Sequence, residues 1–256
     1  MNELTLLQWI MVGIGAFLAG GVNALAGGGT LITFPLLTAV GLPAVVASIT
    51  NTVALCPGYF GATLAQRGDL KDQKRHLWLL VPAAVLGGLL GGWLLLRSGE
   101  KLFSGLVPYL ILLAALLLAL GEPLRAWLRR KKDADGQARS FEWIALPAVT
   151  LAAVYGGYFG AGLSVIILAV LGILLSGSLT KLNALKQALA LATNVAAAVF
   201  FLFSGQVNWP VALVMAVCAL AGGSAGGKLA GKINPTLLRW VVVAVGVVVA
   251  VIYFVK

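Results

Sequence analysis

The sequence predicts an all-α membrane protein that crosses the bilayer many times and consists of two inverted repeats of about five transmembrane segments each. Composition is the first indication, because 61% of the 256 residues are hydrophobic and only 10% are charged. The second is that apolar runs of roughly 20 residues, the length a helix needs to cross a bilayer, recur along the whole chain. The third is an internal repeat of short motifs in the same order.

Ten apolar stretches are separated by short polar or glycine-rich segments, and two of them, 30–42 and 163–175, are short. The N-terminus carries no basic region before the first stretch, so we expect a retained span and not a cleaved signal peptide. The ten stretches are residues 4–26, 30–42, 44–65, 77–96, 102–121, 143–160, 163–175, 183–204, 209–230 and 236–255.

The first landmark is a run of three glycines within residues 23–30, in otherwise apolar sequence. Each glycine costs about 1 kcal/mol relative to alanine in a helix, so we expect the helix to break there. A second glycine-rich stretch, residues 156–162, predicts a second broken helix at the start of the other half. Non-helical backbone inside a bilayer is tolerated only where it is buried in protein or lines a polar cavity, so the breaks indicate a site.

Two further motifs follow the break in each half and establish the repeat. The pattern AxxTN occurs at residues 47–51 and 190–194, and GGxxGG occurs at 87–92 and 222–227. Small residues at this spacing let helices approach closely, so we expect the GGxxGG faces to pack within the chain or in a homodimer. The predicted regions are a first transmembrane repeat, a basic cytoplasmic linker and a second repeat, at residues 1–121, 122–140 and 141–256.

The relation between the repeats follows from counting crossings. Five segments per half is an odd number, so the second half must be inverted relative to the first. With ten crossings, the loops on one side carry 15 of the 18 Lys and Arg residues, whereas eight crossings would divide them 11 to 7. Because basic loops face the cytoplasm, the ten-crossing arrangement is favoured, with both termini outside the cytoplasm. The net charge of +10 is therefore explained by basic loops on the cytoplasmic side, and we expect no nucleic-acid partner.

The two breaks are expected to face each other inside the membrane. A helix over residues 30–42 spans only about 20 Å, so its N-terminus lies within the bilayer. The helix that begins at Leu163 approaches the same level from the opposite side. Two positive dipole ends with their N–H groups then converge on one anion, in the arrangement of many secondary transporters. The alternative is that the glycines merely allow close packing or a kink.

These landmarks carry a resemblance to a known family. The glycine-rich break followed by an apolar run with Pro35, the downstream AxxTN, and the repetition of the set resemble the sulfite exporter TauE/SafE family of membrane transporters, over nearly the whole chain. The resemblance implies export of small anions across the inner membrane, often sulfite or sulfonates such as sulfoacetate. Leu168 stands opposite Pro35, and Gly156 stands opposite Asn23, so we expect the two half-sites to be unequal.

Candidate substrate-binding residues come from the breaks and from polar positions within the spans. The AxxTN side chains offer neutral donors to anion oxygens, and their alternative role is hydrogen bonding between helices. For Lys186 the alternative is a side chain that extends to the cytoplasmic interface. The full set is Asn23, Gly27, Gly28, Gly29, Thr30, Thr50, Asn51, Tyr155, Tyr158, Gly160, Gly162, Lys186, Gln187, Thr193 and Asn194.

Other functional classes lack the residues they need. The spans hold no nucleophile with a base, paired carboxylates or metal cluster, which argues against an enzyme, a metal site or a cofactor. Cys56 and Cys218 are interpreted as small buried hydrophobes. No acidic residue is predicted deep in a span, so proton coupling is not expected and the membrane potential alone drives export. A passive anion channel and a carrier of small carboxylates stay open as alternatives.

Overall fold

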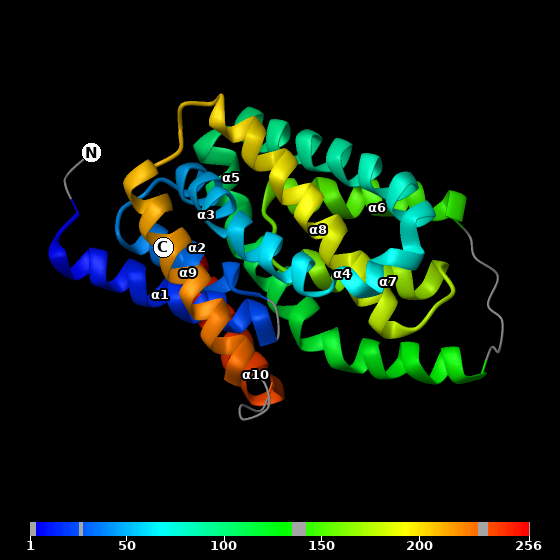
Figure 1. Cartoon of the computed structure of the whole chain (residues 1–256). Helices are drawn as coiled ribbons and strands as arrows, with labels where there is room; N and C mark the ends of the chain where they lie inside the picture. The colour runs from blue at the N-terminus through cyan, green and yellow to red at the C-terminus, as the bar shows by residue number, and fades with distance from the viewer. Residues whose placement is uncertain (1–3, 26–27, 135–141, 230–234, 256) are drawn as a thin grey trace.

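The computed structural model describes residues 4–25, 28–134, 142–229 and 235–255, and these residues form helices and short connections with no β-strand among them (Figure 1). The elements are α1 (Leu6–Leu25), α2 (Thr30–Ala39), α3 (Ala44–Ala65), α4 (Arg67–Leu70), the 3₁₀ helix η1 (Lys71–Gln73), α5 (Lys74–Ala134), α6 (Glu142–Tyr158), α7 (Leu163–Leu174), α8 (Leu179–Leu202), α9 (Trp209–Leu229) and α10 (Pro235–Val255).

Helix α5 accounts for two predicted segments at once. Its backbone leaves helical geometry at Gly99, where φ is 66° and ψ is 172°. Glycine adopts this left-handed conformation at no steric cost, and the chain bends sharply in the middle of α5 (Figure 1). The apolar stretches 77–96 and 102–121 lie on either side of the bend. Beyond the bend the helix continues to Ala134, so the segment after residue 121 begins as helix.

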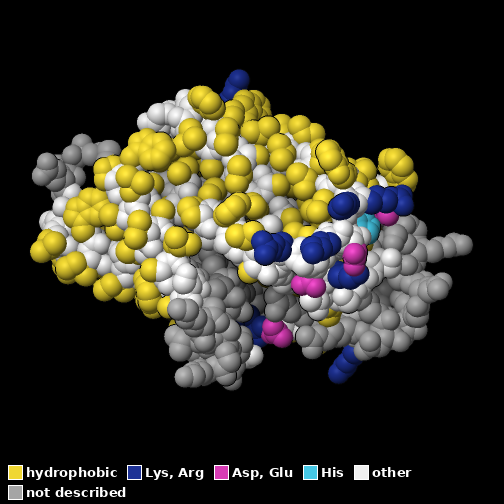
Figure 2. All heavy atoms as spheres, in the orientation of Figure 1, with side chains coloured by type: hydrophobic (Ala, Val, Ile, Leu, Met, Phe, Trp, Pro, Cys, Tyr) yellow, Lys and Arg dark blue, Asp and Glu magenta, His cyan; other side chains and the backbone are white. Residues whose placement is uncertain are grey.

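The described helices suit a membrane environment. Five of them are long and apolar enough to cross a bilayer, including one continuous run over Arg67–Leu128. Large hydrophobic side chains, among them Leu6, Trp143 and Val255, are exposed. Figure 2 shows hydrophobic side chains over much of one face, with charged side chains gathered toward the end where α4 lies. This distribution is expected when lipid covers the apolar surface and water contacts the charged end.

Glycines bring helices from the two halves into direct backbone contact. A Cβ added at Gly222 of α9 would collide with the Phe17 carbonyl of α1, and one added at Gly88 of α5 would collide with the Thr193 carbonyl of α8. Gly91 of the same GGxxGG motif lies against the backbone of α6. These glycine faces therefore pack within the chain, as small residues do between membrane helices. A homodimer stays a prediction.

Candidate functional site

The first break lies between α1 and α2 and is held by Asn23. The Gly29 N–H donates to Asn23 Oδ1 at 2.8 Å, which ties the last turn of α1 to the residue before α2. Gly28 has φ 93°, a conformation that residues with a side chain rarely adopt. Thr33 of α2 donates from Oγ1 to Asn51 Oδ1 of α3. The start of α2 is thus fixed from two sides.

The second break lies between α6 and α7 and is held by Tyr155. The Tyr155 hydroxyl donates to the Ala161 carbonyl at 2.7 Å. Gly160 and Gly162 both have φ near +80°, so the chain reverses there and α7 begins at Leu163. The two breaks are therefore stabilised differently, by an amide oxygen that accepts from backbone in the first and by a hydroxyl that donates to backbone in the second.

Both breaks line one cavity of about 760 Å³. Asn23, Gly28 and Thr30 contribute the wall from the first break, and Gly160 and Gly162 contribute the wall from the second. The N-terminal ends of α2 and α7 consequently reach the same space, where the positive ends of their dipoles favour negative charge.

Lys186 of α8 lines the same cavity and is 6% exposed. Its Nζ donates to Asn183 Oδ1 at 2.9 Å, and Asn183 Nδ2 donates to Gln66 Oε1 at 2.8 Å. The side chain therefore lies in the protein interior and does not extend to the interface. Gln187, the next residue of α8, also lines the cavity.

A second buried cation, Arg239, lines the cavity, and the sequence reasoning missed it. Arg239 lies within the predicted apolar stretch 236–255, one turn inside α10, which begins at Pro235. Its side chain is 7% exposed, and Nη1 lies 3.3 Å from Glu122 Oε1 of α5. The Arg239 Nε is buried with no hydrogen-bond partner in the described part of the protein. Proline favours the first turn of a helix, so Pro235 was the signal that placed Arg239 in a span.

The AxxTN side chains do not line this cavity, although Asn51 Nδ2 lies 3.4 Å from Oγ1 of Thr30, which does. Thr50 Oγ1 accepts a hydrogen bond from the Asn208 N–H at the start of α9, at 3.1 Å. Thr193 Oγ1 donates to the Leu189 carbonyl, and Asn194 Nδ2 donates to a carbonyl one turn earlier in α8. Together with the bond between Asn51 and Thr33, these contacts correspond to the helix-packing alternative for the motif.

The remaining candidates have other surroundings. Tyr155 acts through its hydroxyl on the second break, and Gly29 acts through its amide on the first. Tyr158 packs edge-on against Phe103, with ring centroids 5.4 Å apart. Gly27 lies outside the described residues.

Aromatic rings lie beyond the breaks. Phe34, one turn further along α2 than Thr30, contacts Phe159 at a centroid distance of 5.3 Å and Phe103 at 6.2 Å. All three rings are buried. Phe159 directly precedes Gly160, so this aromatic cluster is adjacent to both breaks. Tyr158 joins these rings through Phe103, and we refer to Phe34, Phe103, Tyr158 and Phe159 as the aromatic cluster.

The other end of the cavity is formed by helix ends. Gln66, Thr180 and Ser224, which lie near ends of α3, α8 and α9, line it there. Close to this rim, Lys181 Nζ lies 3.0 Å from Asp72 Oδ2, and the ammonium group holds the pKa of that carboxyl below its usual range. The cavity thus opens toward the charged end of the molecule, which carries α4, η1 and the start of α8.

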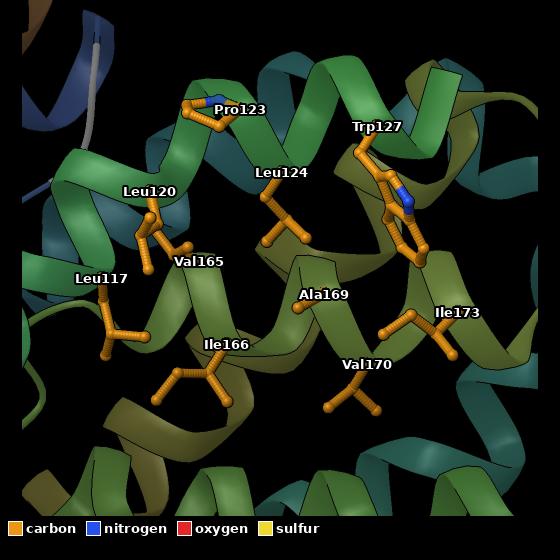
Figure 3. Close-up of a pocket in the computed structure, with 10 residues that line it drawn as sticks. All are labelled: Leu117, Leu120, Pro123, Leu124, Trp127, Val165, Ile166, Ala169, Val170 and Ile173. Carbon is orange, nitrogen blue, oxygen red and sulfur yellow. The ribbon is translucent and has the colours of Figure 1, made fainter. Parts of the chain in front are cut away.

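A smaller cavity of about 470 Å³ lies between α5 and α7. Figure 3 shows its lining, in which Leu117, Pro123 and Trp127 come from α5 and Val165 and Ile173 come from α7. Its lining is apolar apart from the Trp127 indole N–H, and it contains no charged side chain to balance an anion. Among the described residues, no three His, Cys, Asp or Glu side chains gather as a metal site would require.

Comparison with known proteins identifies the family of this chain. The model of the family described as sulfite exporter TauE/SafE matches residues 12–253. The chain belongs to this family. A TauE/SafE assignment over nearly the whole sequence includes both breaks, Lys186 and Arg239.

Relatives of this TauE/SafE chain have transporter names. A probable membrane transporter protein of Haemophilus influenzae is 30% identical, over 89% of this chain and 87% of its own length. Probable membrane transporter protein ORF9 of a Sinorhizobium species is 29% identical, over 98% of this chain and 94% of its own length. Probable membrane transporter protein YfcA of Escherichia coli is 26% identical, over 97% of this chain and 91% of its own length. No solved structure matches the chain significantly. The protein is a multi-pass membrane transporter of the TauE/SafE family.

Proposed function

We propose that this transporter exports small sulfur-containing anions, sulfite or organosulfonates such as sulfoacetate, through the cavity at which the two breaks meet. The observation that carries the proposal is the convergence of two helix N-termini with the buried side chains of Lys186 and Arg239 on one space. Two cations that line one cavity attract an oxyanion, whose oxygens accept charge-assisted hydrogen bonds from such groups. The name of the family, sulfite exporter TauE/SafE, supports the sulfur chemistry.

The same proposal includes two inverted repeats in the inner membrane, with both termini outside the cytoplasm. Apart from the short α4 and η1, five helical segments precede the region 135–141 when α5 is divided at Gly99, and α6 to α10 supply five more. The short helices α2 and α7 occupy the same place in each half. If the basic loops face the cytoplasm, the cavity opens to the cytoplasm, and the aromatic cluster closes it on the outer side. This is the inward-open state in which an exporter binds its substrate.

We further propose that the membrane potential drives export. An inside-negative potential moves a monovalent anion outward with about 2.3 kcal/mol per 100 mV, so no second ion is needed. The test uses proteoliposomes loaded with a sulfonate of fixed charge, with the potential set by potassium and valinomycin. Efflux should follow the imposed potential and be unchanged by a pH gradient at constant potential. Efflux that ignores the potential, or that requires the pH gradient, would refute this driving force.

A passive channel and a carrier of small carboxylates are the alternatives. Saturable efflux that distinguishes a sulfonate from a carboxylate of similar size supports the proposed carrier. High conductance with weak selectivity favours a channel, and tighter binding of acetate than of methanesulfonate favours the carboxylate carrier. Neutral substitution of Arg239 should abolish saturable efflux in the carrier, because the anion then loses one of its two buried cations.

A further inference from the structure

Three charged side chains line the cavity among the described residues, and one of them is an acid. Lys186 and Arg239 are cations, while Glu122 is the carboxylate that lies 3.3 Å from Arg239. Two cations and one carboxylate leave one net positive charge. Glu122 is 48% exposed, whereas the Arg239 side chain is 7% exposed, so the acid lies toward water and the guanidinium lies inside.

Arg239 retains hydrogen-bonding capacity in this arrangement. A guanidinium presents five N–H donors in a planar fork that fits two oxygens of one anion. Glu122 approaches Nη1, and Nε is buried without a partner in the described structure. Arg239 also lines the cavity, so an anion held there lies next to the same side chain that Glu122 approaches. The substrate and Glu122 consequently share one cation and lie close enough for their charges to interact.

We propose that Glu122 sets the charge of the anion that the cavity accepts, favouring an oxyanion headgroup with one negative charge over one with two. This inference rests on the proposed function. A singly charged headgroup neutralises the net positive charge of the cavity, whereas a doubly charged one leaves an uncompensated charge in a partly buried site. The repulsion from Glu122 is proportional to the charge of the headgroup, so the acid penalises the divalent ion twice as strongly in free energy.

Methanesulfonate and sulfate are the probes, because both are small tetrahedral sulfur oxyanions and they carry one and two charges. Their binding to the purified full-length protein in nanodiscs is measured by isothermal titration calorimetry. Glu122→Gln keeps the shape of the side chain and removes its charge. If this variant binds methanesulfonate about tenfold more tightly, its affinity for sulfate should rise about a hundredfold, because the relieved repulsion is twice as large in free energy. The preference for methanesulfonate over sulfate therefore falls about tenfold, and any effect shared by both ions cancels in this ratio.

Two variants serve as controls. Glu122→Asp keeps the charge and should leave the ratio within about threefold of the original. Glu142→Gln makes the same chemical change in an acid that pairs with Arg75 outside the cavity, at 2.8 Å, and should also leave the ratio unchanged. Because Glu122 is about half-exposed, its neutralisation is not expected to unfold the protein, and the thermal unfolding midpoint checks this.

The outcomes separate this inference from the function on which it rests. A shift of the ratio in Glu122→Gln alone supports charge selection by Glu122. Equal gains for both anions, no gain for either, or the same shift in Glu142→Gln would overturn charge selection while leaving anion transport in place. Absence of binding of either anion by the unmodified protein and by Glu122→Gln would overturn the proposed function, and the inference with it.

Discussion

Replacement of Lys186 by methionine tests the site most directly. Methionine has nearly the volume and flexibility of the lysine stem, so packing around this buried position in α8 is preserved while the charge is removed. The expected result is a large loss of anion affinity with a small change in stability. If Lys186 had only a structural role, any loss of anion affinity would be accompanied by a comparable loss of stability.

The magnitudes follow from the surroundings of Lys186. Two opposite unit charges 4 Å apart interact by about 4 kcal/mol at an effective dielectric constant of 20, and part of this is offset by desolvation of the anion. We therefore expect the affinity for methanesulfonate to fall at least 30-fold. For the free energy of unfolding, loss of the donor to Asn183 costs about 1 kcal/mol, while removal of a buried charge compensates in part. The net change in stability should stay within about 1.5 kcal/mol.

The assay is isothermal titration calorimetry of methanesulfonate, with thermal unfolding measured on the same samples. Lys181→Met is the matched control, since Lys181 is in the same helix but pairs with Asp72 at the exposed rim. It should change affinity less than threefold. An unchanged affinity in Lys186→Met would remove Lys186 from the site. An equal loss in both variants would assign the effect to the general positive potential of this end of the molecule.

Three further predictions follow from the contacts of the helices. Thr50→Val removes the acceptor of the Asn208 N–H and should lower the unfolding free energy by about 1 to 3 kcal/mol with sulfonate affinity unchanged, whereas a tenfold loss of affinity would place Thr50 at the substrate. Phe103→Ala should open a leak in the aromatic cluster, seen as increased passive sulfonate efflux from proteoliposomes, and an unaltered leak rate would show that another layer closes the cavity. A cysteine at Asp135 should be shielded from an impermeant thiol reagent in intact cells while one at Lys256 reacts, and the reverse pattern would contradict the proposed topology.

Much of the helical framework could be predicted from the sequence, because apolar length and glycine content act locally. Each of the ten predicted stretches corresponds to a helix, or to one side of the bend at Gly99, and α2 and α7 each begin directly after a glycine. The position of Lys186 in the cavity could be anticipated only as one of two options, since a lysine near a span end either reaches the interface or turns inward.

The parts that could not be predicted depend on which helix faces which. Thr50 and Asn194 are polar residues in matching motifs, yet one accepts from the start of α9 and the other donates within its own helix. Glu122 and Arg239 are far apart in the sequence and meet only because α5 and α10 pack together. A charge at the end of an apolar stretch gives no indication of such a partner, so Glu122 was expected only as part of the basic linker and Arg239 was not named as a site residue.

The contact between α1 and α9 has a consequence for the evolution of substrate range. Gly20, Ala219 and Gly223 belong to this contact and also line the cavity, and a Cβ at Gly20 would collide with the Ala219 carbonyl. The width of the cavity on this side is therefore set by the distance between two backbones. A single methyl group at Gly20 or Gly222 pushes whole helices apart and widens the cavity along its length, without touching any group that binds the anion. Headgroup chemistry and ligand size can thus diverge independently, the first through a few charged side chains and the second through glycines on helix faces.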